Sequence, residues 1–260
     1  MGKVYASSDW HGCLAPAQKV LDFLQPDDKL YFLGDAIDRG DHGYQIMTKL
    51  LNDPRVVYMR GNHEQMMLEA VEDMIKYGIE EFQFSCMNDN WIEVNGGIKT
   101  LEDMNWGKGI DLLFLYKKIQ LMPFLCHYTS KSGNGIILEH AGYTPDNLGE
   151  VLHLNHDPVW DRSHFYDNWT GTENMYLVHG HTPVQYLKFN YGYNGQEPFT
   201  QEDLKFKRTW DLNSTYKPEV IRYCDGHKFD IDMCTIVSGR IALLDLDTFE
   251  VIYFDEGEKE

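Results

Sequence analysis

The amino-acid sequence predicts an α/β sandwich with mixed β-sheets, and three features of the chain indicate this fold class. Short apolar strands alternate with helical segments over residues 3–59. Residues 64 to about 121 are mostly helical, and short strands return after Pro123. A simple doubly wound fold would continue the strand–helix alternation to the end of the chain, so a sandwich of mixed sheets explains the pattern better.

The first part of the chain contains two strand–helix–strand repeats. Short apolar runs predict strands, and apolar residues at helical spacing predict helices. Asn52-Asp53-Pro54 ends the second helix, because proline cannot continue one. The expected strands cover residues 3–7, 29–33 and 55–59, and the expected helices cover residues 14–24 and 44–51.

The helical middle of the chain carries one apolar face, made of Met66, Met67, Ala70, Val71 and Met74. Such a stripe is typical of a helix that faces a core, and it is not a ligand set. We expect the region from residue 64 to about 121 to cap one side of the cleft at the ends of the strands.

The second half of the chain is mainly β. Residues 124–129 and 136–139 are expected to form a hairpin around Ser132-Gly133-Asn134-Gly135. Further strands are expected at residues 175–178, 228–232, 241–246 and 251–254. Residues 190–220, rich in Tyr, Asn, Gly and isolated charges, fit either a long loop or a small insertion.

Composition narrows the class of protein. The 260 residues, 43% of them hydrophobic, supply core material for one domain over residues 1–260. No apolar run approaches the roughly 20 residues that a membrane-spanning helix needs, and the first residues lack a secretory signal. Five scattered cysteines without a CxxC pair indicate reduced thiols in a cytoplasmic protein. A net charge of −18 would repel nucleic-acid polymers, so they are not expected partners. We favour a monomer.

Five short motifs carry residues suited to metal chemistry, and the first three directly follow predicted strands. Open α/β sheets bind their ligands at these carboxyl ends of strands. The motifs are Ser8-Asp9-Trp10-His11-Gly12, Gly34-Asp35-Ala36-Ile37-Asp38-Arg39-Gly40, Arg60-Gly61-Asn62-His63-Glu64, His140-Ala141-Gly142 and Gly180-His181-Thr182-Pro183.

The motifs supply enough ligands for two neighbouring divalent cations. Mn²⁺, our first choice, and the alternatives Fe²⁺ and Zn²⁺ accept carboxylate, imidazole and amide oxygen together. Two such ions lower the pKa of a shared water, which can then attack phosphorus in line. Asp9 or His11 alone would indicate only a turn, but the ordered set with its strand context indicates a metal site. The candidate ligands are Asp9, His11, the bridging Asp35, Asn62, His140 and His181.

Two further roles follow from the residues beside these ligands. An alkoxide leaving group needs a proton, which His63 next to Asn62 is placed to give, while Asp38 could orient this imidazole and raise its pKa. Guanidinium groups match phosphoryl oxygens through paired hydrogen bonds. Arg39, Arg60 and Arg162 are the candidates for this contact.

These motifs resemble those of the phosphoprotein phosphatase (PPP) branch of the calcineurin-like metallophosphoesterases, and Trp91 with Asn95-Gly96-Gly97 is similar to its compact bacterial and phage-type members. The resemblance runs through residues 7–183. It implies a four-layer αββα fold, two bound metals and Ser/Thr phosphatase activity that sometimes extends to phosphotyrosine and small phosphoesters.

The chain departs from that pattern at three places. Ser8 stands where the family usually has Gly, and Asp232-Met233-Cys234 stands where it commonly has Asp-Thr-Gly. His179 precedes Gly180, so by alignment His181 is the ligand, and His179 is expected to be a core group or a group supporting the ligands.

The sequence therefore predicts a dinuclear metallophosphatase acting on phosphoserine and phosphothreonine in proteins, with phosphotyrosine as a further substrate. An alternative with the same chemistry is hydrolysis of diadenosine tetraphosphate, symmetrical or asymmetrical. Symmetrical hydrolases commonly carry Ala where this chain has Asp38, which favours the phosphatase. A remote alternative is a non-catalytic binding protein with the same fold.

Overall fold

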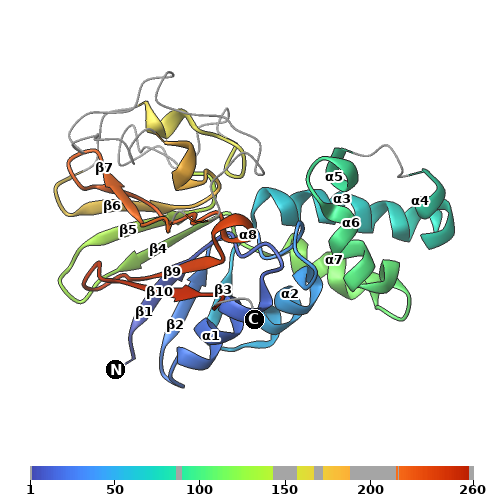
Figure 1. Cartoon of the computed structure of the whole chain (residues 1–260), viewed down its shortest axis with the longest axis horizontal. Helices are drawn as coiled ribbons and strands as arrows, with labels where there is room; N and C mark the ends of the chain where they lie inside the picture. Colours follow the sequence, from blue (N-terminus) through green and yellow to red (C-terminus); the bar gives the residue numbers. More distant parts are fainter. Residues whose placement is uncertain are drawn as a thin grey trace.

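Two five-stranded β-sheets pack face to face in the part of the chain that the structure describes (Figure 1). This computed structural model describes residues 2–85, 90–142, 157–166, 172–187, 215 and 217–257. Most of the stretch 190–220, which the sequence left open, lies outside these described residues.

The first sheet, sheet A, is mixed and contains the strands that follow one another at the start of the chain. Its order is β10-β9-β1-β2-β3. The first three strands in sequence are parallel, and the two last strands of the chain add to them in antiparallel fashion. The strands are β1 (Val4–Ser7), β2 (Lys29–Phe32), β3 (Val56–Tyr58), β9 (Arg240–Asp245) and β10 (Val251–Asp255).

The second sheet, sheet B, is also mixed, with the order β4-β5-β6-β8-β7. β5, β6 and β8 are parallel, while β4 and β7 are the antiparallel edge strands. The strands are β4 (Leu125–Thr129), β5 (Gly135–Glu139), β6 (Met175–His179), β7 (Ile221–Tyr223) and β8 (Lys228–Asp230).

Side-chain alternation along β2 shows how sheet A serves two cores. Leu30 and Phe32 point to the helices, whereas Tyr31 and Leu33 point to sheet B, as the period of two in a strand requires. Both faces of the strand are therefore buried, which explains why its sequence is a continuous apolar run. Ile136, Leu138, Val178 and Phe229 of sheet B complete the core between the sheets.

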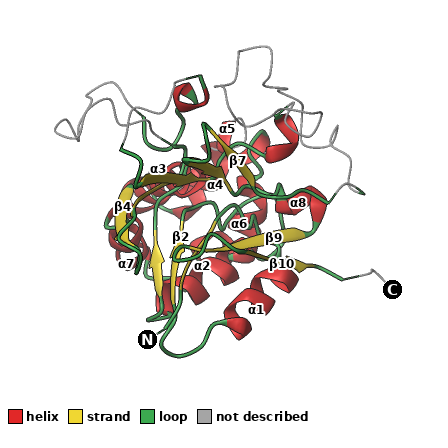
Figure 2. Ribbon diagram, turned by 90° about the vertical axis from the view of Figure 1, so that its left-hand side faces the viewer, coloured by secondary structure: helices red, strands yellow, loops and turns green. Residues whose placement is uncertain are grey.

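The outer face of sheet A is covered by helices α1 (Leu14–Phe23) and α2 (Gly43–Asn52) (Figure 2). The outer side of sheet B near β7 packs against two short 3₁₀ helices, η3 (Ser163–Phe165) and η4 (Val184–Tyr186). The predicted α/β sandwich with mixed sheets is confirmed, and in the described part its layer over sheet B consists of these short turns.

A group of helices gathers at one end of the molecule, beside the sheets (Figure 1). In α3 the predicted apolar face is buried, with Met67, Val71 and Met74 almost inaccessible to solvent. The helices are α3 (Asn62–Tyr77), α4 (Ile79–Ser85), α5 (Asn90–Glu93), α6 (Gly97–Asp103), η2 (Asn105–Gly107) and α7 (Leu112–Gln120).

Three elements differ from the sequence-based expectation. The strand expected at residues 228–232 ends at Asp230, because the Asp230 carboxylate accepts the N–H of Asp232 at 3.1 Å and turns the chain. Strand β7 and the one-turn helix α8 (Thr235–Ser238) were not predicted, since each is too short to show a period.

Candidate metal centre

The six candidate ligands lie together where the carboxyl ends of strands from both sheets meet. Asp9 and His11 follow β1, Asp35 follows β2, and Asn62 begins α3 directly after β3. From sheet B, one histidine follows β5 and the other follows β6. The two sheet B residues are His140 and His181.

The backbone of these loops is strained at the ligands themselves. Asp9, His11, Asp35 and His181 all have positive φ, between 41° and 66°, a region that non-glycine residues rarely adopt. Hydrogen bonds between loops hold this conformation: the N–H of Asp9 donates to Gly34 O at 3.1 Å, and that of His11 donates to Asp35 O at 3.0 Å. Strain of this kind persists where the surrounding structure enforces it, and it gathers at functional sites.

Two groups of ligand atoms share one carboxylate. His11, Asp35 and His63 form one group, and Asp35, His140 and His181 form the other, each with its ligand atoms within 4.8 Å of one another. Oδ2 of Asp35 lies 3.8 Å from His11 Nε2 and 3.5 Å from His140 Nε2. The position of Asp35 between the groups is the one that a bridging carboxylate needs.

The remaining two candidates complete these groups. Oδ1 of Asn62 lies 2.9 Å from both His140 Nε2 and His181 Nδ1. Oδ1 of Asp9 lies 3.9 Å from His11 Nε2, and its Oδ2 accepts the backbone N–H of His181 at 3.0 Å. Asp9 therefore adds an oxygen to the first group and ties it to the loop that carries the second.

The electrostatics of the cluster favour bound cations. Burial, together with the charge of Asp232, raises the pKa of Asp9 to about 7. Burial and the nearby Glu64 and Asp9 raise the pKa of Asp35 well above its usual value. Burial lowers the pKa of His11 and His181, so both imidazoles are neutral and can donate lone pairs. Buried carboxylates that repel one another are stabilised when divalent cations neutralise them.

One unpaired atom supports the same conclusion. Among the described residues, Nε2 of His181 is a buried polar atom without a hydrogen-bond partner, and such atoms are rare unless they have a function. The donor set of the cluster as a whole, imidazole nitrogens with carboxylate and amide oxygens, fits a borderline divalent cation such as Mn²⁺, Fe²⁺ or Zn²⁺.

Arg39 places its positive charge at the mouth of the first group. Its NH1 lies 3.0 Å from His11 Nε2, and its NH2 lies 3.1 Å from His63 Nε2. The Nδ1 atom of His11 faces the carbonyl of Ile37 at 2.9 Å, so that nitrogen carries the proton and Nε2 accepts. The guanidinium of Arg39 thus lies against two histidines of the cluster. This position agrees with the predicted contact of Arg39 with a phosphoryl group of the substrate.

His63 and Asp38 form the pair that the sequence predicted, but the expected rise in the pKa of His63 is wrong. Burial and the charges of Arg39 and His140 hold the pKa of His63 well below its usual value. His63 Nδ1 lies 2.6 Å from Asp38 Oδ2, and both side chains are inaccessible to solvent. Burial raises the pKa of Asp38 to about 7, against hydrogen bonds from Thr100 and Trp91 and the charge of Arg39. The Nε2 atom of His63 faces Asp35 Oδ2 at 3.7 Å, so the imidazole spans from its carboxylate partner to the metal cluster.

The two remaining arginines lie in different surroundings. Arg162 donates its Nε–H to Thr182 Oγ1 at 2.9 Å, directly after His181. Burial lowers the pKa of Arg162, and the charge of Asp232 opposes this shift. Arg162 thus lies near the candidate ligands. Asp232, in the loop that departs from the Asp-Thr-Gly pattern, places an acidic side chain near Arg162.

The structure does not bring the guanidinium of Arg60 to the ligands. Its NH2 donates to the carbonyls of Ile119 and Gln120 at 2.9 and 2.6 Å, and its charge lies 4.4 Å above the ring of Phe124. These contacts satisfy carbonyls at the end of α7, which have no partner inside the helix. The expected contact of Arg60 with phosphoryl oxygens therefore has no support in this geometry.

Several supporting residues had no role in the sequence-based prediction. The Glu64 carboxylate accepts the N–H groups of Asp35, Ala36 and Gly61 at 2.8 to 3.0 Å and the hydroxyl of Tyr58 at 2.7 Å. It thereby fixes the loop that carries Asp35 against the start of α3. A glutamate three residues into a helix is a capping signal that the sequence does contain.

Two glycines allow close approach to the acidic ligands. A Cβ on Gly61 would lie 2.1 Å from Asp35 Oδ1, and a Cβ on Gly180 would lie 2.2 Å from Asp9 Oδ2. The positions directly before the candidate ligands Asn62 and His181 therefore have no room for a side chain. His179, by contrast, is buried with Nε2 2.8 Å from the Tyr223 hydroxyl, as expected for a group outside the ligand set.

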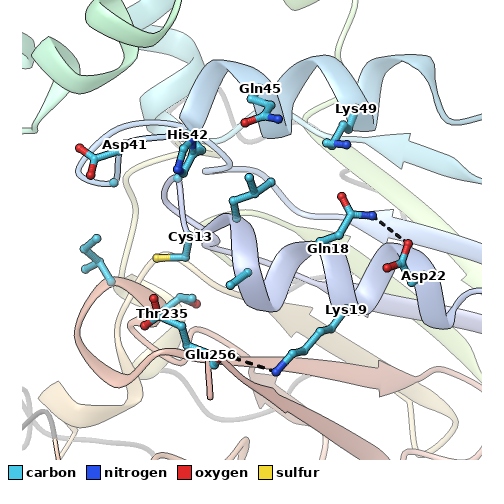
Figure 3. A pocket seen from close by; sticks show the side chains of 15 residues that line it. Cys13, Gln18, Lys19, Asp22, Asp41, His42, Gln45, Lys49, Thr235 and Glu256 are labelled. Carbon is cyan, nitrogen blue, oxygen red and sulfur yellow. Dashed lines mark hydrogen bonds between the residues drawn. The ribbon is translucent and has the colours of Figure 1, made fainter. Parts of the chain in front are cut away.

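A separate cavity of about 700 Å³ lies behind the ligand loops, and Figure 3 shows it between α1 and α2. Gly12 and Gly40, the residues after His11 and Arg39, form part of its wall. None of the six candidate ligands lines this cavity, so the metal cluster faces a different space.

The fold and the site together define a metal-dependent hydrolase: an α/β sandwich with two ligand groups that share one aspartate. The chain belongs to the calcineurin-like phosphoesterase family, whose model matches residues 2–208. Relatives named bacterial serine/threonine-protein phosphatases match the chain at 25–27% identity, and members of the family depend on a dinuclear metal site.

Curated relatives differ in the substrates that their names give. The chain is 27% identical over 183 residues to serine/threonine-protein phosphatase 2 of Salmonella typhimurium, covering 68% of this chain and 75% of that protein. It is 25% identical over 187 residues to serine/threonine-protein phosphatase 1 of the same organism, covering 70% and 79%. It is also 28% identical over 146 residues to a symmetrical bis(5'-nucleosyl)-tetraphosphatase of Actinobacillus succinogenes, covering 55% and 45%.

Solved structures support the fold. A metallophosphoesterase from Sphaerobacter thermophilus matches with a TM-score of 0.51 and 12% identity, covering 99% of this chain and 89% of that chain. A protein serine/threonine phosphatase from Saccharomyces cerevisiae matches with a TM-score of 0.52 and 11% identity, covering 100% and 81%. At these identities the likeness concerns the arrangement of the chain alone.

Proposed function

We propose that the protein is a dinuclear metallophosphatase that hydrolyses phosphoserine and phosphothreonine in proteins and also accepts phosphotyrosine. The observation that carries this proposal is the His63–Asp38 pair at 2.6 Å beside the shared Asp35. A phosphomonoester of serine leaves as an alkoxide and needs a proton, which a buried imidazole held by a carboxylate can give. The Salmonella phosphatase names point to the same substrates.

The metal ligands in this proposal come from both groups. Asp9, His11 and Asp35 would hold one cation, while Asp35 and the set Asn62, His140 and His181 would hold the second. Mn²⁺ is our first choice, with Fe²⁺ and Zn²⁺ as alternatives. When bound, the pair would supply Lewis-acid activation of water and neutralise phosphoryl charge.

Side chains of the protein would supply the proton for the leaving group and bind the phosphoryl oxygens. His63 acts in its imidazolium form, which gives its Nε2 proton to the leaving oxygen while Asp38 holds the ring through Nδ1; the Arg39 guanidinium that faces Nε2 in this structure would turn to the phosphoryl oxygens. Arg39 and Arg162 bind the phosphoryl oxygens, because paired N–H donors match their geometry. We propose that Arg60 anchors α7 instead.

The second candidate function is hydrolysis of diadenosine tetraphosphate, which the Actinobacillus relative favours. Its leaving group is a nucleotide phosphate, which departs without a proton. Hydrolysis of the dinucleotide would therefore not need the His63–Asp38 pair as a proton donor. We therefore rank it below the phosphatase. A non-catalytic binding protein is disfavoured because all six candidate ligands lie together and four of them, Asp9, His11, Asp35 and His181, are held in strained backbone.

We also propose a cytoplasmic protein that meets phosphoproteins as substrates. The four described cysteines, Cys13, Cys126, Cys224 and Cys234, form no disulfide with one another, as in reducing compartments. In the described part of the chain no helix has the length and apolarity to cross a membrane.

The decisive experiment compares a phosphoserine peptide, a phosphotyrosine peptide and diadenosine tetraphosphate, each after chelation and after addition of Mn²⁺. We expect metal-restored release of phosphate from the peptides. Asp35→Asn and His63→Asn variants, checked for folding, serve as controls and should be inactive on the phosphoserine peptide. Turnover of the dinucleotide alone would move the protein to nucleotide hydrolysis.

A further inference from the structure

The buried carboxylate of Asp38 receives hydrogen bonds from the helical region as well as from His63. Trp91 of α5 donates its Nε1–H to Asp38 Oδ2 at 2.5 Å, the same oxygen that faces His63 Nδ1. Thr100 of α6 donates its hydroxyl to Asp38 Oδ1 at 2.5 Å. The Thr100 oxygen in turn accepts the backbone N–H of Asp38 at 2.8 Å, so both oxygens and the main chain of this residue are fixed.

The loop between Trp91 and Thr100 is built to allow these contacts. A Cβ on Gly97 would lie 2.5 Å from the indole ring of Trp91, so only glycine lets the ring lie flat against this turn. Gly96 has φ of +80°, and its carbonyl accepts the N–H of Arg39 at 3.2 Å. The segment from Trp91 to Thr100 thus docks on Asp38 and on the backbone of Arg39 together.

We propose that Trp91 and Thr100 are positioning residues for proton transfer, which hold the Asp38 carboxylate at the angle where its Oδ2 meets His63 Nδ1. The proposal rests on the proposed function in one respect, the role of His63 as general acid. It gives the helical region a task in the reaction: α5 and α6 set the orientation of the acid.

Burial and packing alone give a competing explanation, in which the indole and the hydroxyl only satisfy a buried acid. The two explanations differ in what they predict for different leaving groups. A loss of proton transfer slows esters whose alkoxide needs a proton and spares p-nitrophenyl phosphate, whose leaving group departs without one. A general loss of structure slows both substrates alike.

The experiment measures kcat and KM of the Mn²⁺-loaded protein on a phosphoserine peptide and on p-nitrophenyl phosphate. For Trp91→Phe and Thr100→Val, kcat on the peptide should fall by about 10- to 100-fold, a part of the roughly 10²- to 10⁴-fold that general acid catalysis contributes. KM and the turnover of p-nitrophenyl phosphate should stay within about threefold of wild type. Equal losses on both substrates, or no loss on the peptide, would overturn the proposal.

Matched variants separate the hydroxyl from the shape of the side chain. Thr100→Ser keeps the hydroxyl and should retain wild-type selectivity, whereas Thr100→Val keeps the shape and should lose it. Trp106→Phe is the control for the indole. Trp106 packs against the same core of the helical region and lies outside the contacts of Asp38. Selectivity lost in Thr100→Ser or in Trp106→Phe would contradict the assignment.

A second measurement is independent of activity. In metal-free protein, the short His63–Asp38 hydrogen bond should give a downfield proton NMR signal that disappears in His63→Asn. We expect this signal to move in Trp91→Phe and Thr100→Val and to stay in Trp106→Phe. If it stays unchanged in the first two variants, the positioning role is refuted. If wild-type protein hydrolyses neither ester, the proposed function fails, and the NMR result still decides the positioning role.

Discussion

The Asp9 carboxylate accepts the backbone N–H of His181 at 3.0 Å, although the two residues are 172 positions apart. This bond joins the loop after β1 of sheet A to the loop after β6 of sheet B. It exists because Gly180 has no side chain, since a Cβ there would lie 2.2 Å from Asp9 Oδ2. The close approach of these two loops at the candidate metal centre therefore requires the absence of a side chain at Gly180.

Gly180→Ala should weaken metal binding by about 10- to 100-fold, the range found when groups that support ligands are removed. The added methyl group would displace the Asp9 carboxylate from the cluster. Titration of metal-free protein with Mn²⁺, followed by calorimetry, measures this effect. Gly135→Ala is the matched control, because its Cβ would meet His127 at 3.4 Å and Met175 at 3.6 Å, which are ordinary contacts. Wild-type affinity in Gly180→Ala would contradict the role of this approach.

Arg39 and Arg60 should respond in opposite ways to substitution. Arg39→Lys keeps the charge but loses the fork that reaches His11 and His63, so kcat/KM on a phosphoserine peptide should fall by about 100-fold. The melting temperature should change little. Steady-state kinetics and thermal unfolding of the same preparation give both values.

Arg60→Met should instead lower the free energy of unfolding by about 1–3 kcal/mol, because the carbonyls of Ile119 and Gln120 lose their donor. Its kcat/KM should stay within about threefold of wild type after correction for the folded fraction. A large kinetic loss in a stable Arg60→Met variant would restore the sequence-based assignment of this arginine to the phosphoryl group.

These two arginines show what the sequence could predict of the site. The clustering of the candidate ligands was predictable because a motif at the end of a strand fixes where its residues lie. The direction of a long side chain is not fixed in this way: Arg60 adjoins the ligand Asn62, yet its side chain turns to α7. Trp91 and Thr100 lie 53 and 62 residues from Asp38, and no periodicity in the sequence records such a contact.

The fold likewise has elements that the sequence predicts and elements that it does not. β2 and the apolar face of α3 were predicted because burial writes a regular pattern into several consecutive residues. β7 has three residues, and α8 has four, so neither is long enough for a pattern. The end of β8 depends on one side chain, since Asp230 bonds to the backbone two residues later.

The ion pair of Asp255 with Arg240 should make a pH-dependent contribution to stability. The hydrogen bond from Arg240 lowers the pKa of Asp255 to about 2 in the folded protein. Because the folded value is depressed, the stabilisation is present above the unfolded pKa of about 4 and is lost as the pH falls toward 2. The gain is small, since the side chain is 41% exposed.

Asp255→Asn should therefore be slightly less stable than wild type at neutral pH, and the difference should shrink below about pH 4. Urea unfolding of metal-free protein across this range measures it. A difference that grows on acidification would contradict the sign of the shift.

Asp35→Asn should have opposite effects on stability without and with metal. In metal-free protein the Asp35 carboxylate is buried near Glu64 and Asp9, whose charges oppose its ionisation. An amide keeps an oxygen to accept the N–H of His63, as Asp35 Oδ1 does at 3.1 Å, and it removes the repulsion. The metal-free variant should thus be more stable than metal-free wild type, as expected where function costs stability.

Addition of Mn²⁺ should reverse this order, because a ligand that binds only the folded state raises the free energy of unfolding by an amount that grows with the logarithm of its affinity. Wild type should gain several degrees in melting temperature, and Asp35→Asn should gain little, since it lacks the carboxylate shared by both ligand groups. Thermal unfolding with chelator and with Mn²⁺ tests both halves. An equal gain in the two proteins would show that the cations do not depend on Asp35, and the shared-carboxylate geometry would then not be the metal centre.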